Sequence, residues 1–499
     1  RELLKDVDYE LVQGNLDIEI SDIAYDSRKA QDGVMFMALV GFRVDGHDYI
    51  DAAIENGCRV IAVEHDVTVG EDITVIKLKD IRVDLSILSR TLFGYPDKGM
   101  TTIAITGTKG KTTSSTMIQH ILNVSGKECG LIGTMGVFYL DKFYHTMNTS
   151  PESYDVFKYM REMLDHGVHY LVMEVSSQSL KLKRWVNVIF DYAIFTNLSL
   201  DHVGTDEHES FNDYKYCKSL LFKQCKVGIF NLDSEYASDM MEGTICDKYY
   251  YGKDSRANYR LVECSNVIKN GFTGIEMETD GKIQDTFMVS ILGTFTAYNA
   301  LAAISVCDLL GVSISDMKRA LEVVKVKGRM ESVSVSSKFS VVIDYAYQGI
   351  AMENVLKTVR ESNPGRIVTV FGCGGNRSRQ RRFDCGEISG KYSDFSILTA
   401  DNPRYEDNSK IIEDILVGMK KTDGKYIIID NRKEAIRYSI ENAKDGDVIL
   451  ILGKGHEDYQ EINGVRYPFD ERVIIKEIID EMNEEEKEKL GIVVEKIKY

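Results

Sequence analysis

The stretch Thr101-Thr102-Ile103-Ala104-Ile105-Thr106-Gly107-Thr108-Lys109-Gly110-Lys111-Thr112-Thr113 decides the fold of this chain. Its first half is a short β-branched run that predicts a buried strand. A glycine-rich turn follows, and then a helical pattern whose apolar face carries Met117, Ile118, Ile121 and Leu122. Such a turn can hold phosphate oxygens on its backbone N–H groups, while Lys111 reaches the terminal phosphates and the Thr112 hydroxyl binds Mg²⁺.

One position departs from the general P-loop pattern, because Ile105 stands where that pattern has its first glycine. A glycine-rich turn without a function is the alternative interpretation. Phosphate binding requires a strand before the turn and a helix after it, and the sequence supplies both. The stretch therefore predicts a variant phosphate loop.

Composition excludes several classes of protein. The chain has 499 residues, a formal net charge of −17, 43% hydrophobic residues and nine Cys. The length predicts about two to four domains, and the negative charge argues against a nucleic-acid partner. No apolar run reaches the roughly 18 residues of a membrane span, and the N-terminus does not have the pattern of a signal peptide. Scattered Cys residues without a CxxC motif favour reduced thiols and a cytoplasmic location.

Strand-like and helical patterns alternate along three segments. A break at Gly94-Tyr95-Pro96-Asp97-Lys98-Gly99 and another near Gly328 predict domains at 1–98, 99–327 and 328–499. The alternation predicts an α/β fold with mainly parallel sheets, in which ligands bind beyond the carboxyl ends of strands. The other expected strands are Val34–Leu39, Val60–Val63, Tyr170–Val175, Val188–Phe195, Val227–Asn231, Ser340–Ile343, Arg366–Phe371, Phe395–Leu398, Tyr426–Ile429 and Asp447–Leu452. A β-rich insertion is expected at about 250–290, and helices are expected at Tyr49–Asn56, Ala297–Leu310 and the acidic run Glu484–Glu488.

Three residues beyond the loop stand out by their positions. Glu174 ends an apolar strand, where a carboxylate can hold Mg²⁺, although a plain sheet edge is the alternative. His202 follows another strand in Asn197-Leu198-Ser199-Leu200-Asp201-His202, where a structural His is the alternative. Lys218 projects from the apolar stripe of a helix at Phe211–Phe222. Burying an ammonium there is costly, and the alternative is a side chain that snorkels at the rim.

The segment Gly107–Thr113 resembles the ATP loop of the Mur ligase family, whose members form the amide bonds of the peptidoglycan stem peptide at the expense of ATP. The resemblance implies a three-domain architecture. An N-terminal α/β domain would bind a UDP-linked substrate, a central P-loop domain would bind ATP, and a C-terminal Rossmann-like domain would bind an amino acid. The implied ATP contacts are Gly107, Thr108, Lys109, Gly110, Lys111, Thr112, Thr113, Asn299, Arg329 and Asp344.

The same resemblance gives Lys218 a chemical role. In this family the lysine of Tyr-x-x-x-Lys-x-x-Leu-Phe carries a carbamate derived from CO₂, which turns a cation into an oxygen ligand. The resemblance implies that Mg²⁺ is held by Thr112, Glu174, His202 and Lys218 as N6-carboxylysine. It also implies that Lys111, Glu174, His202 and Lys218 are the catalytic residues.

Two further sets of residues resemble the family's substrate segments. The first set implies binding of UDP-N-acetylmuramoyl-L-alanyl-D-glutamate by Tyr25, Ser27, His47, Asn148, Thr149, Ser150, Ser176 and Arg184. The second set implies binding of a diamino acid by Arg377, Asp401, Asn402, Arg404, Gly453 and Glu457. Asp401-Asn402-Pro403-Arg404 resembles the family members that add meso-diaminopimelate, because an Arg can hold its distal carboxylate. L-Lysine lacks that carboxylate and is the alternative substrate.

Some positions depart from the family. Tyr347 stands where the family usually has His, and Asn376 and Ser378 replace two acidic residues. These changes leave open the alternative that the chain is a nucleotide-binding module that has lost ligase activity. A dinucleotide-dependent dehydrogenase is not supported, because Gly372-Cys373-Gly374-Gly375-Asn376-Arg377 lacks the last Gly of its fingerprint. We expect a monomeric ligase that activates the glutamate carboxylate as an acyl phosphate, which the diamino acid's amine then displaces.

Overall fold

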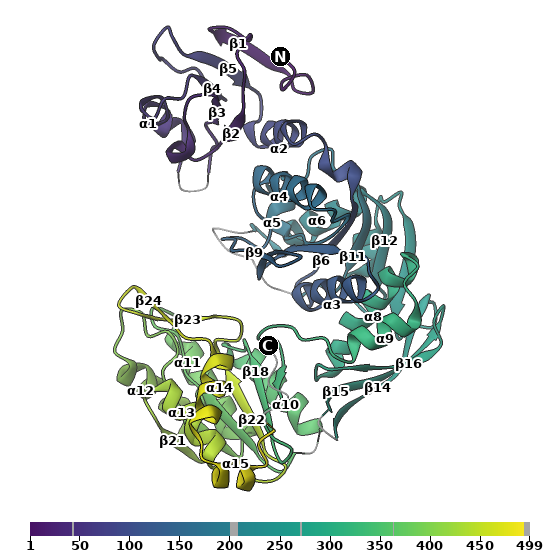
Figure 1. Ribbon diagram of the computed structural model, residues 1–499, viewed down its shortest axis with the longest axis vertical. Helices are drawn as coiled ribbons and strands as arrows, with labels where there is room; N and C mark the ends of the chain where they lie inside the picture. The colour runs from purple at the N-terminus through teal and green to yellow at the C-terminus, as the bar shows by residue number, and fades with distance from the viewer. Residues whose placement is uncertain (42–43, 200–207, 270–271, 363, 494–499) are drawn as a thin grey trace. The chain divides into compact units, whose positions relative to one another are not determined.

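In the computed structural model of the protein (Figure 1), residues 1–41, 44–199, 208–269, 272–362 and 364–493 are described. Their contacts divide the chain into two compact units. The first unit comprises Arg1–Asn258 and Ala302–Ser313, and the second comprises Tyr259–Leu301 and Ile314–Tyr499.

The first unit begins with a five-stranded sheet in the order β1-β5-β4-β3-β2. Strands β2 to β5 run parallel, and β1 pairs antiparallel at the edge. Successive residues of β3 face opposite sides, so that Met35 and Met37 pack with helix α2 while Phe36 packs with α1. The elements are β1 (Tyr9–Gln13), β2 (Asp22–Ala24), η1 (Ser27–Lys29), β3 (Val34–Met37), η2 (Gly46–Tyr49), α1 (Ile50–Glu55), β4 (Val60–Val63), β5 (Thr74–Leu78), α2 (Ile81–Leu92) and η3 (Pro96–Gly99).

A second sheet of this unit has the order β13-β12-β11-β6-β10-β7-β8-β9. Strand β6 (Thr101–Thr106) has the predicted bounds and runs parallel to β10 and β11 on either side. Its residues are almost wholly buried, as expected of a strand covered on both faces. The other strands are β7 (Cys129–Gly133), β8 (Gly136–Tyr139), β9 (Lys142–Tyr144), β10 (Tyr170–Glu174), β11 (Phe190–Phe195), β12 (Cys225–Asn231) and β13 (Asp247–Gly252).

Helices cover both faces of this sheet. The residues Met117, Ile118 and Ile121 of α3 are buried, as their spacing predicts, and α4 and α6 pack into the core of the other face. The helix expected at Phe211–Phe222 is shorter than predicted, because its last turn tightens into a 3₁₀ helix. The helical elements are α3 (Lys111–Val124), α4 (Ser153–Asp165), α5 (Ser177–Lys181), α6 (Phe211–Ser219), η4 (Leu220–Lys223) and α7 (Ala237–Met241).

The second unit contains the expected β-rich insertion and a six-stranded sheet. The insertion is an antiparallel set of β14 (Tyr259–Lys269), β15 (Phe272–Gly281) and β16 (Asp285–Val289). Helix α8 (Thr294–Leu309) passes from the second unit into the first, and α9 (Ile314–Leu321) follows.

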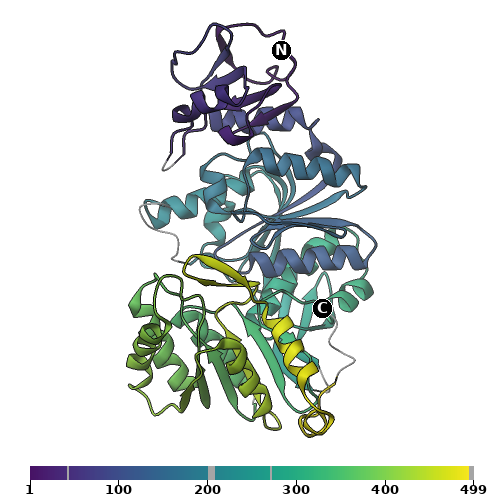
Figure 2. The same ribbon diagram turned by 60° about the vertical axis from the view of Figure 1, so that its left-hand side comes forward.

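The six-stranded sheet has the order β17-β18-β22-β19-β20-β21 and is parallel except for β17. Helices α13 and α14 pack on one face through a shared apolar core, and Figure 2 shows α14 in yellow along these strands. The strands are β17 (Glu331–Val333), β18 (Ser340–Asp344), β19 (Ile367–Phe371), β20 (Phe395–Leu398), β21 (Tyr426–Ile428) and β22 (Val448–Leu452), with a hairpin of β23 (Tyr459–Ile462) and β24 (Val465–Pro468). The helices are α10 (Gly349–Glu361), α11 (Arg379–Tyr392), α12 (Asn408–Met419), α13 (Arg432–Glu441), α14 (Glu471–Glu481) and α15 (Glu484–Leu490).

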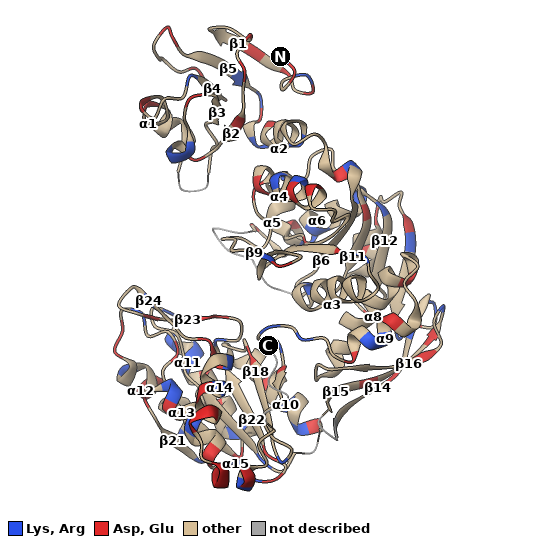
Figure 3. Cartoon of the chain, in the orientation of Figure 1, with Lys and Arg blue, Asp and Glu red and all other residues tan. Residues whose placement is uncertain are grey.

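Two further expectations are confirmed. The acidic run lies on α15 (Figure 3), where Asn483 and Glu486 form a capping box. All nine Cys residues are free thiols. Within the described ranges, no helix has both the length and the apolar character that a bilayer crossing requires.

Candidate active site

The glycine-rich turn lies at the carboxyl end of the central strand β6 and leads into α3. Gly107 has φ +152°, and a Cβ there would lie 1.9 Å from Thr196 Oγ1, so no other residue fits without displacing the loop. The Lys111 ammonium folds back over the turn and donates to the carbonyls of Gly107 at 2.8 Å and Thr108 at 3.2 Å. Gly110 is the N-cap of α3, so the turn ends at the amino end of a 14-residue helix.

Segments after the two neighbouring strands hold this turn. Asn197, which follows β11, accepts from the Lys109 N–H at 3.0 Å through its side chain and from the Thr108 N–H at 2.9 Å through its carbonyl. The Thr196 hydroxyl donates to the Lys109 carbonyl at 2.7 Å. These contacts fix the loop backbone, and they arise because β6 and β11 end level with each other.

Glu174 ends β10 beside the turn and is fully buried. Its Oε2 accepts from the Thr112 hydroxyl at 3.1 Å and from the Thr134 hydroxyl at 2.9 Å, and its Oε1 accepts from the Thr134 N–H at 3.1 Å. Gly133 allows this approach, because a Cβ there would lie 2.3 Å from Oε1. The predicted pair of Thr112 and Glu174 therefore meets as a cluster of hard oxygen atoms, and this donor chemistry fits Mg²⁺.

Lys218 on α6 is 2% exposed, in agreement with the prediction that it lies within the apolar stripe. Its Nζ donates to the Gly107 carbonyl at 3.0 Å and lies 4.7 Å from the centre of the Tyr214 ring. The Tyr214 hydroxyl lies 3.0 Å from Thr108 Oγ1. Both residues of the helix therefore contact the phosphate loop. His202, the fourth predicted metal ligand, lies outside the described residues.

A partly buried polar chain next to these groups was not predicted. His208 Nε2 lies 2.9 Å from Ser177 Oγ, and its Nδ1 lies 2.9 Å from Asp213 Oδ2, which also accepts from Lys181 at 2.8 Å. Burial lowers the pKa of His208. Burial opposes ionisation of Asp213, but hydrogen bonds from Lys181 and His208 lower its pKa to about 2. Asp213 is thus an anion that orients a neutral imidazole toward Ser177.

Part of the predicted UDP-substrate set converges beside Glu174. The Ser150 hydroxyl donates to the Glu174 carbonyl at 2.8 Å and accepts from the Ser176 N–H at 3.0 Å. Arg184 donates to the Ser150 carbonyl at 2.6 Å and pairs with Glu152, while its Nε is buried without a partner. Thr149 joins this group, since its Oγ1 lies 3.1 Å from Thr134 Oγ1.

Among the other members of that set, Tyr25, Ser27 and His47 make separate hydrogen bonds. The Tyr25 hydroxyl donates to the Asp155 carboxylate of α4. Burial has the larger effect and this carboxylate the next, and both raise the pKa of Tyr25. Ser27 begins η1, and Asn148 is exposed. His47 stacks on His65 with ring centres 3.7 Å apart, its Nδ1 lies 2.7 Å from Asp45, and its Nε2 accepts from the Glu64 N–H at 3.1 Å.

The remaining predicted nucleotide contacts belong to the second unit. Asp344, at the end of β18, is buried and accepts from the N–H groups of Met330 and Ala346 at 2.7 and 2.8 Å, and burial raises its pKa. The Arg329 guanidinium lies over the Tyr345 ring at 5.2 Å. Asn299 is buried on α8. Their contact with ATP stays a prediction.

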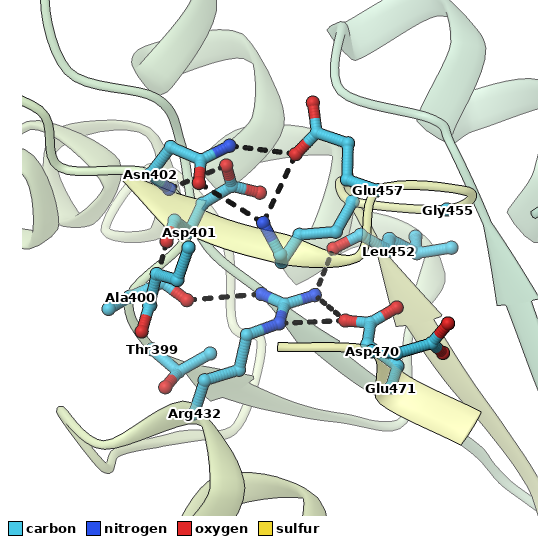
Figure 4. Close-up of polar contacts among 12 residues, drawn as sticks. Thr399, Ala400, Asp401, Asn402, Arg432, Leu452, Gly455, Glu457, Asp470 and Glu471 are labelled. Carbon is cyan, nitrogen blue, oxygen red and sulfur yellow. Dashed lines mark hydrogen bonds and ion pairs between the residues drawn. The ribbon is translucent and has the colours of Figure 1, made fainter. Parts of the chain in front are cut away.

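Most of the predicted amino-acid site forms one polar neighbourhood at the carboxyl ends of β20 and β22. Gly453 has φ +113°, and a Cβ there would lie 2.5 Å from Asp401 Oδ2, so glycine lets the two strand ends approach. Asn402 donates to Glu457 Oε2 at 2.8 Å (Figure 4). Arg404 Nε lies 3.4 Å from Glu461 Oε2, and its Nη1 donates to the Gly375 carbonyl at 2.7 Å. Arg377 is exposed.

A buried ion pair underlies this neighbourhood. Arg432 and Glu471 are both 0% exposed, and Arg432 Nη2 lies 2.7 Å from Glu471 Oε1. Arg432 also donates to the carbonyls of Ala400 at 3.2 Å and Leu452 at 2.8 Å, at the ends of β20 and β22 (Figure 4). It therefore ties together the two strand ends from which Asp401, Asn402 and Gly453 emerge.

Sequence reasoning missed Thr134, Lys454 and Arg432. Thr134 directly follows β7, and its position after a strand was the one available signal. Lys454 lies inside Gly453-Lys454-Gly455-His456-Glu457, but nothing in the spacing distinguishes a buried Lys from a solvated one. Arg432 begins α13 after an Asn cap, where a charged side chain is usually exposed.

Comparisons with known proteins agree along the whole chain. The Mur ligase family catalytic-domain model matches residues 19–87, the Mur ligase middle-domain model matches 105–307, and the Mur ligase glutamate-ligase-domain model matches 328–455. The chain is 41% identical over 484 residues to the UDP-N-acetylmuramoyl-L-alanyl-D-glutamate–2,6-diaminopimelate ligase of Caldanaerobacter subterraneus subsp. tengcongensis, covering 96% of this chain and 98% of that protein. It is 39% identical over 487 residues to the ligase of the same name from Clostridium botulinum, covering 96% and 99%. A solved structure of a ligase of that name matches with a TM-score of 0.70 at 27% identity, covering 94% of this chain and 97% of that one.

Proposed function

The chain belongs to the Mur ligase family, and on that premise we propose that it joins 2,6-diaminopimelate to UDP-N-acetylmuramoyl-L-alanyl-D-glutamate in an ATP-dependent reaction. One observation carries this function. Relatives of that name match nearly the whole chain, and the models of three Mur ligase domains match it one after another. The product would be a UDP-linked tripeptide of peptidoglycan synthesis.

We assign the binding of the terminal phosphates of ATP to the phosphate loop. Lys111 now spans the carbonyls of Gly107 and Thr108, so its ammonium already lies inside the turn that would enclose those phosphates. There it would stabilise charge that builds up as the glutamate carboxylate attacks the γ-phosphate and ADP leaves. The acyl phosphate that results would be consumed when the amine of the diamino acid attacks its carbonyl carbon and phosphate leaves.

Magnesium would be held by Thr112 and Glu174, together with His202 and Lys218. The fit of the first two rests on their oxygen atoms, which lie 3.1 Å apart beside the loop. When bound, Mg²⁺ would neutralise phosphate charge. We propose that Lys218 carries a carbamate, because a lysine that is 2% exposed beside a phosphate loop gains by exchanging a buried cation for an oxygen ligand.

The UDP-linked substrate is assigned to Tyr25, Ser27, His47, Asn148, Thr149, Ser150, Ser176 and Arg184. Support comes from Ser150, Ser176 and Arg184, which lie together beside the buried Glu174. The unpartnered Nε of Arg184 suits an anionic group. The diamino acid is assigned to Arg377, Asp401, Asn402, Arg404, Gly453 and Glu457, where two Arg residues could bind a distal carboxylate.

The proposal extends to the organisation of the protein. We assign UDP-substrate binding to 1–98, ATP binding to 99–327 and amino-acid binding to 328–499. We further propose that the enzyme is a cytoplasmic monomer. The absence of a membrane-crossing helix among the described residues and the nine free thiols are consistent with that location.

The decisive experiment supplies ATP, the UDP-linked dipeptide and one amino acid at a time, and follows ADP release together with product mass. We expect the tripeptide with 2,6-diaminopimelate. Lys111→Ala should abolish it, whereas Lys226→Ala should retain turnover, because Lys226 lies at the start of β12 in an exposed pair with Asp191. Product with L-lysine alone would support the alternative substrate. ATP binding without product from either amino acid would support a non-ligating module.

A further inference from the structure

Two ion pairs lie in the amino-acid site. Lys454 Nζ lies 3.1 Å from Glu457 Oε2, and Arg404 Nε lies 3.4 Å from Glu461 Oε2. Both pairs lie near the Tyr459 phenol: Lys454 Nζ is 5.4 Å from its ring centre, and burial, then Glu457, raises its pKa, on which Arg466, Glu461 and Arg404 also act. The two pairs therefore share one neighbourhood, and within each pair the opposite charges offset each other.

Lys454 is the most deeply buried of the four. Its side chain is 0% exposed, whereas the Glu457 side chain is 15% exposed. Its ammonium donates to Asn402 Oδ1 at 3.1 Å and to Glu457 Oε2 at 3.1 Å, and lies 5.4 Å from the centre of the Tyr459 ring. A buried ammonium is tolerated only with partners of this kind. Lys454 thus places its ammonium group behind Glu457, on the side away from solvent.

The two oxygen atoms of Glu457 have different surroundings. Oε2 accepts from both Asn402 and Lys454, which holds the carboxylate in one orientation. No described residue donates a hydrogen bond to Oε1, and Figure 4 shows that oxygen pointing away from the network. Oε1 is therefore the acceptor that can meet an ammonium group of a ligand.

We propose that Lys454 determines which diamino acid the site prefers. By offsetting the charge of Glu457 it leaves no net charge on the pair that faces a ligand through Oε1. A pair without net charge suits the far end of diaminopimelate, where an ammonium and a carboxylate also cancel, and it disfavours the lone ammonium of L-lysine. The inference rests on the proposed function, because it assumes that an amino acid binds here.

The geometry explains why charge, and not loop collapse, would dominate the effect of removing Lys454. Arg432 holds the carbonyls of Ala400 and Leu452 from below, so the strand ends stay in place without Lys454. Asn402 would still hold Oε2 of Glu457. Removing only the ammonium therefore leaves the negative charge of Glu457 unpaired, and that charge attracts a lone ammonium more than a zwitterionic group.

The test measures kcat/KM for 2,6-diaminopimelate and for L-lysine, and follows their ratio across variants. Lys454→Met should lower the ratio at least about 10-fold, and Glu457→Gln should raise it, because the unpaired Lys454 then repels L-lysine more strongly. The double variant K454M/E457Q again carries no net charge at this pair, so its ratio should return to within about 3-fold of the wild type. Lys421→Met is the matched control, since Lys421 forms an exposed pair with Glu387 at 2.9 Å on the same unit, and its ratio should not change.

Opposite shifts in the two single variants distinguish a charge effect from damage to the fold, which would move both ratios alike. Lys454→Met and Glu457→Gln shifting in the same direction, or Lys454→Met leaving the ratio unchanged, would overturn the proposal. If the wild type made neither product, the proposed function would fail separately. The ratio of the two amino acids' dissociation constants, from equilibrium dialysis with the same variants, would still decide the role of Lys454.

Discussion

Replacing Arg432 with Met should destabilise the second unit strongly without changing its surface. Both Arg432 and Glu471 are 0% exposed, so the variant leaves a carboxylate buried without its cation. Breaking one side of such a pair costs about 3–5 kcal/mol. At roughly 2–4 °C per kcal/mol for a unit of this size, the melting temperature should fall by on the order of 6–20 °C. Calorimetry of the whole protein would measure this as a shift of the transition that belongs to the second unit.

Two companion measurements test the reasoning. The double variant Arg432→Met with Glu471→Met removes both charges and should recover most of the loss. Burial already raises the pKa of Glu471 in the folded protein. Below the pKa of an unfolded Glu, Glu471 of the single variant is therefore protonated in both the folded and the unfolded state. The free energy of unfolding that the single variant loses should accordingly become smaller as the pH falls toward about 4. A double variant as unstable as the single one, or a deficit that grows on acidification, would refute the explanation by an unpaired buried charge.

Three other outcomes follow from the structure. Glu174→Gln should lower the rate of phosphate release at least about 100-fold with little loss of stability. The reason is that Gln can still hydrogen-bond to Thr112 and Thr134 but carries no charge. A rate near that of the wild type would show that Glu174 is not part of the site. Gly453→Ala should raise the KM for the diamino acid, since its Cβ would lie 2.5 Å from Asp401, while Gly446→Ala, with φ +80° but its nearest neighbour at 3.5 Å, should change stability alone. Burial lowers the pKa of His456 to about 4, so the free energy of unfolding should fall as the pH drops from about 6.5 to about 4. In acid-denaturation curves, His456→Phe should make this dependence on pH weaker. Equal dependence in the variant and the wild type would contradict the role given to His456.

The fold could be predicted largely from local pattern. The strand at Thr101–Thr106 and the apolar face of α3 follow from β-branched runs and helical spacing, and both are confirmed. The strand at Val60–Val63 also has its predicted bounds. Errors occur at element ends, as where the helix at Phe211–Phe222 finishes in a 3₁₀ turn, because end geometry depends on capping and packing and not on periodicity.

The site was predicted less completely. Lys218 was singled out because it is a charged residue on the apolar face of its helix and because its segment resembles that of the family. Its burial is confirmed. Thr134 was missed, although it donates two hydrogen bonds to Glu174, because its only sequence signal was a position after a strand. The assignments of residues to ATP, to the UDP-linked substrate and to the diamino acid stay predictions.

The sequence by itself determined the order of strands, turns and helices, since side-chain size and glycine spacing act within a few residues. Only the tertiary structure decided which distant groups meet. Glu174 faces Thr112 and Thr134 because β10 lies between β6 and β7, and Lys454 faces Asn402 because β20 and β22 end on the same side of one sheet. Strand order is set by how whole elements pack, and no local pattern encodes it.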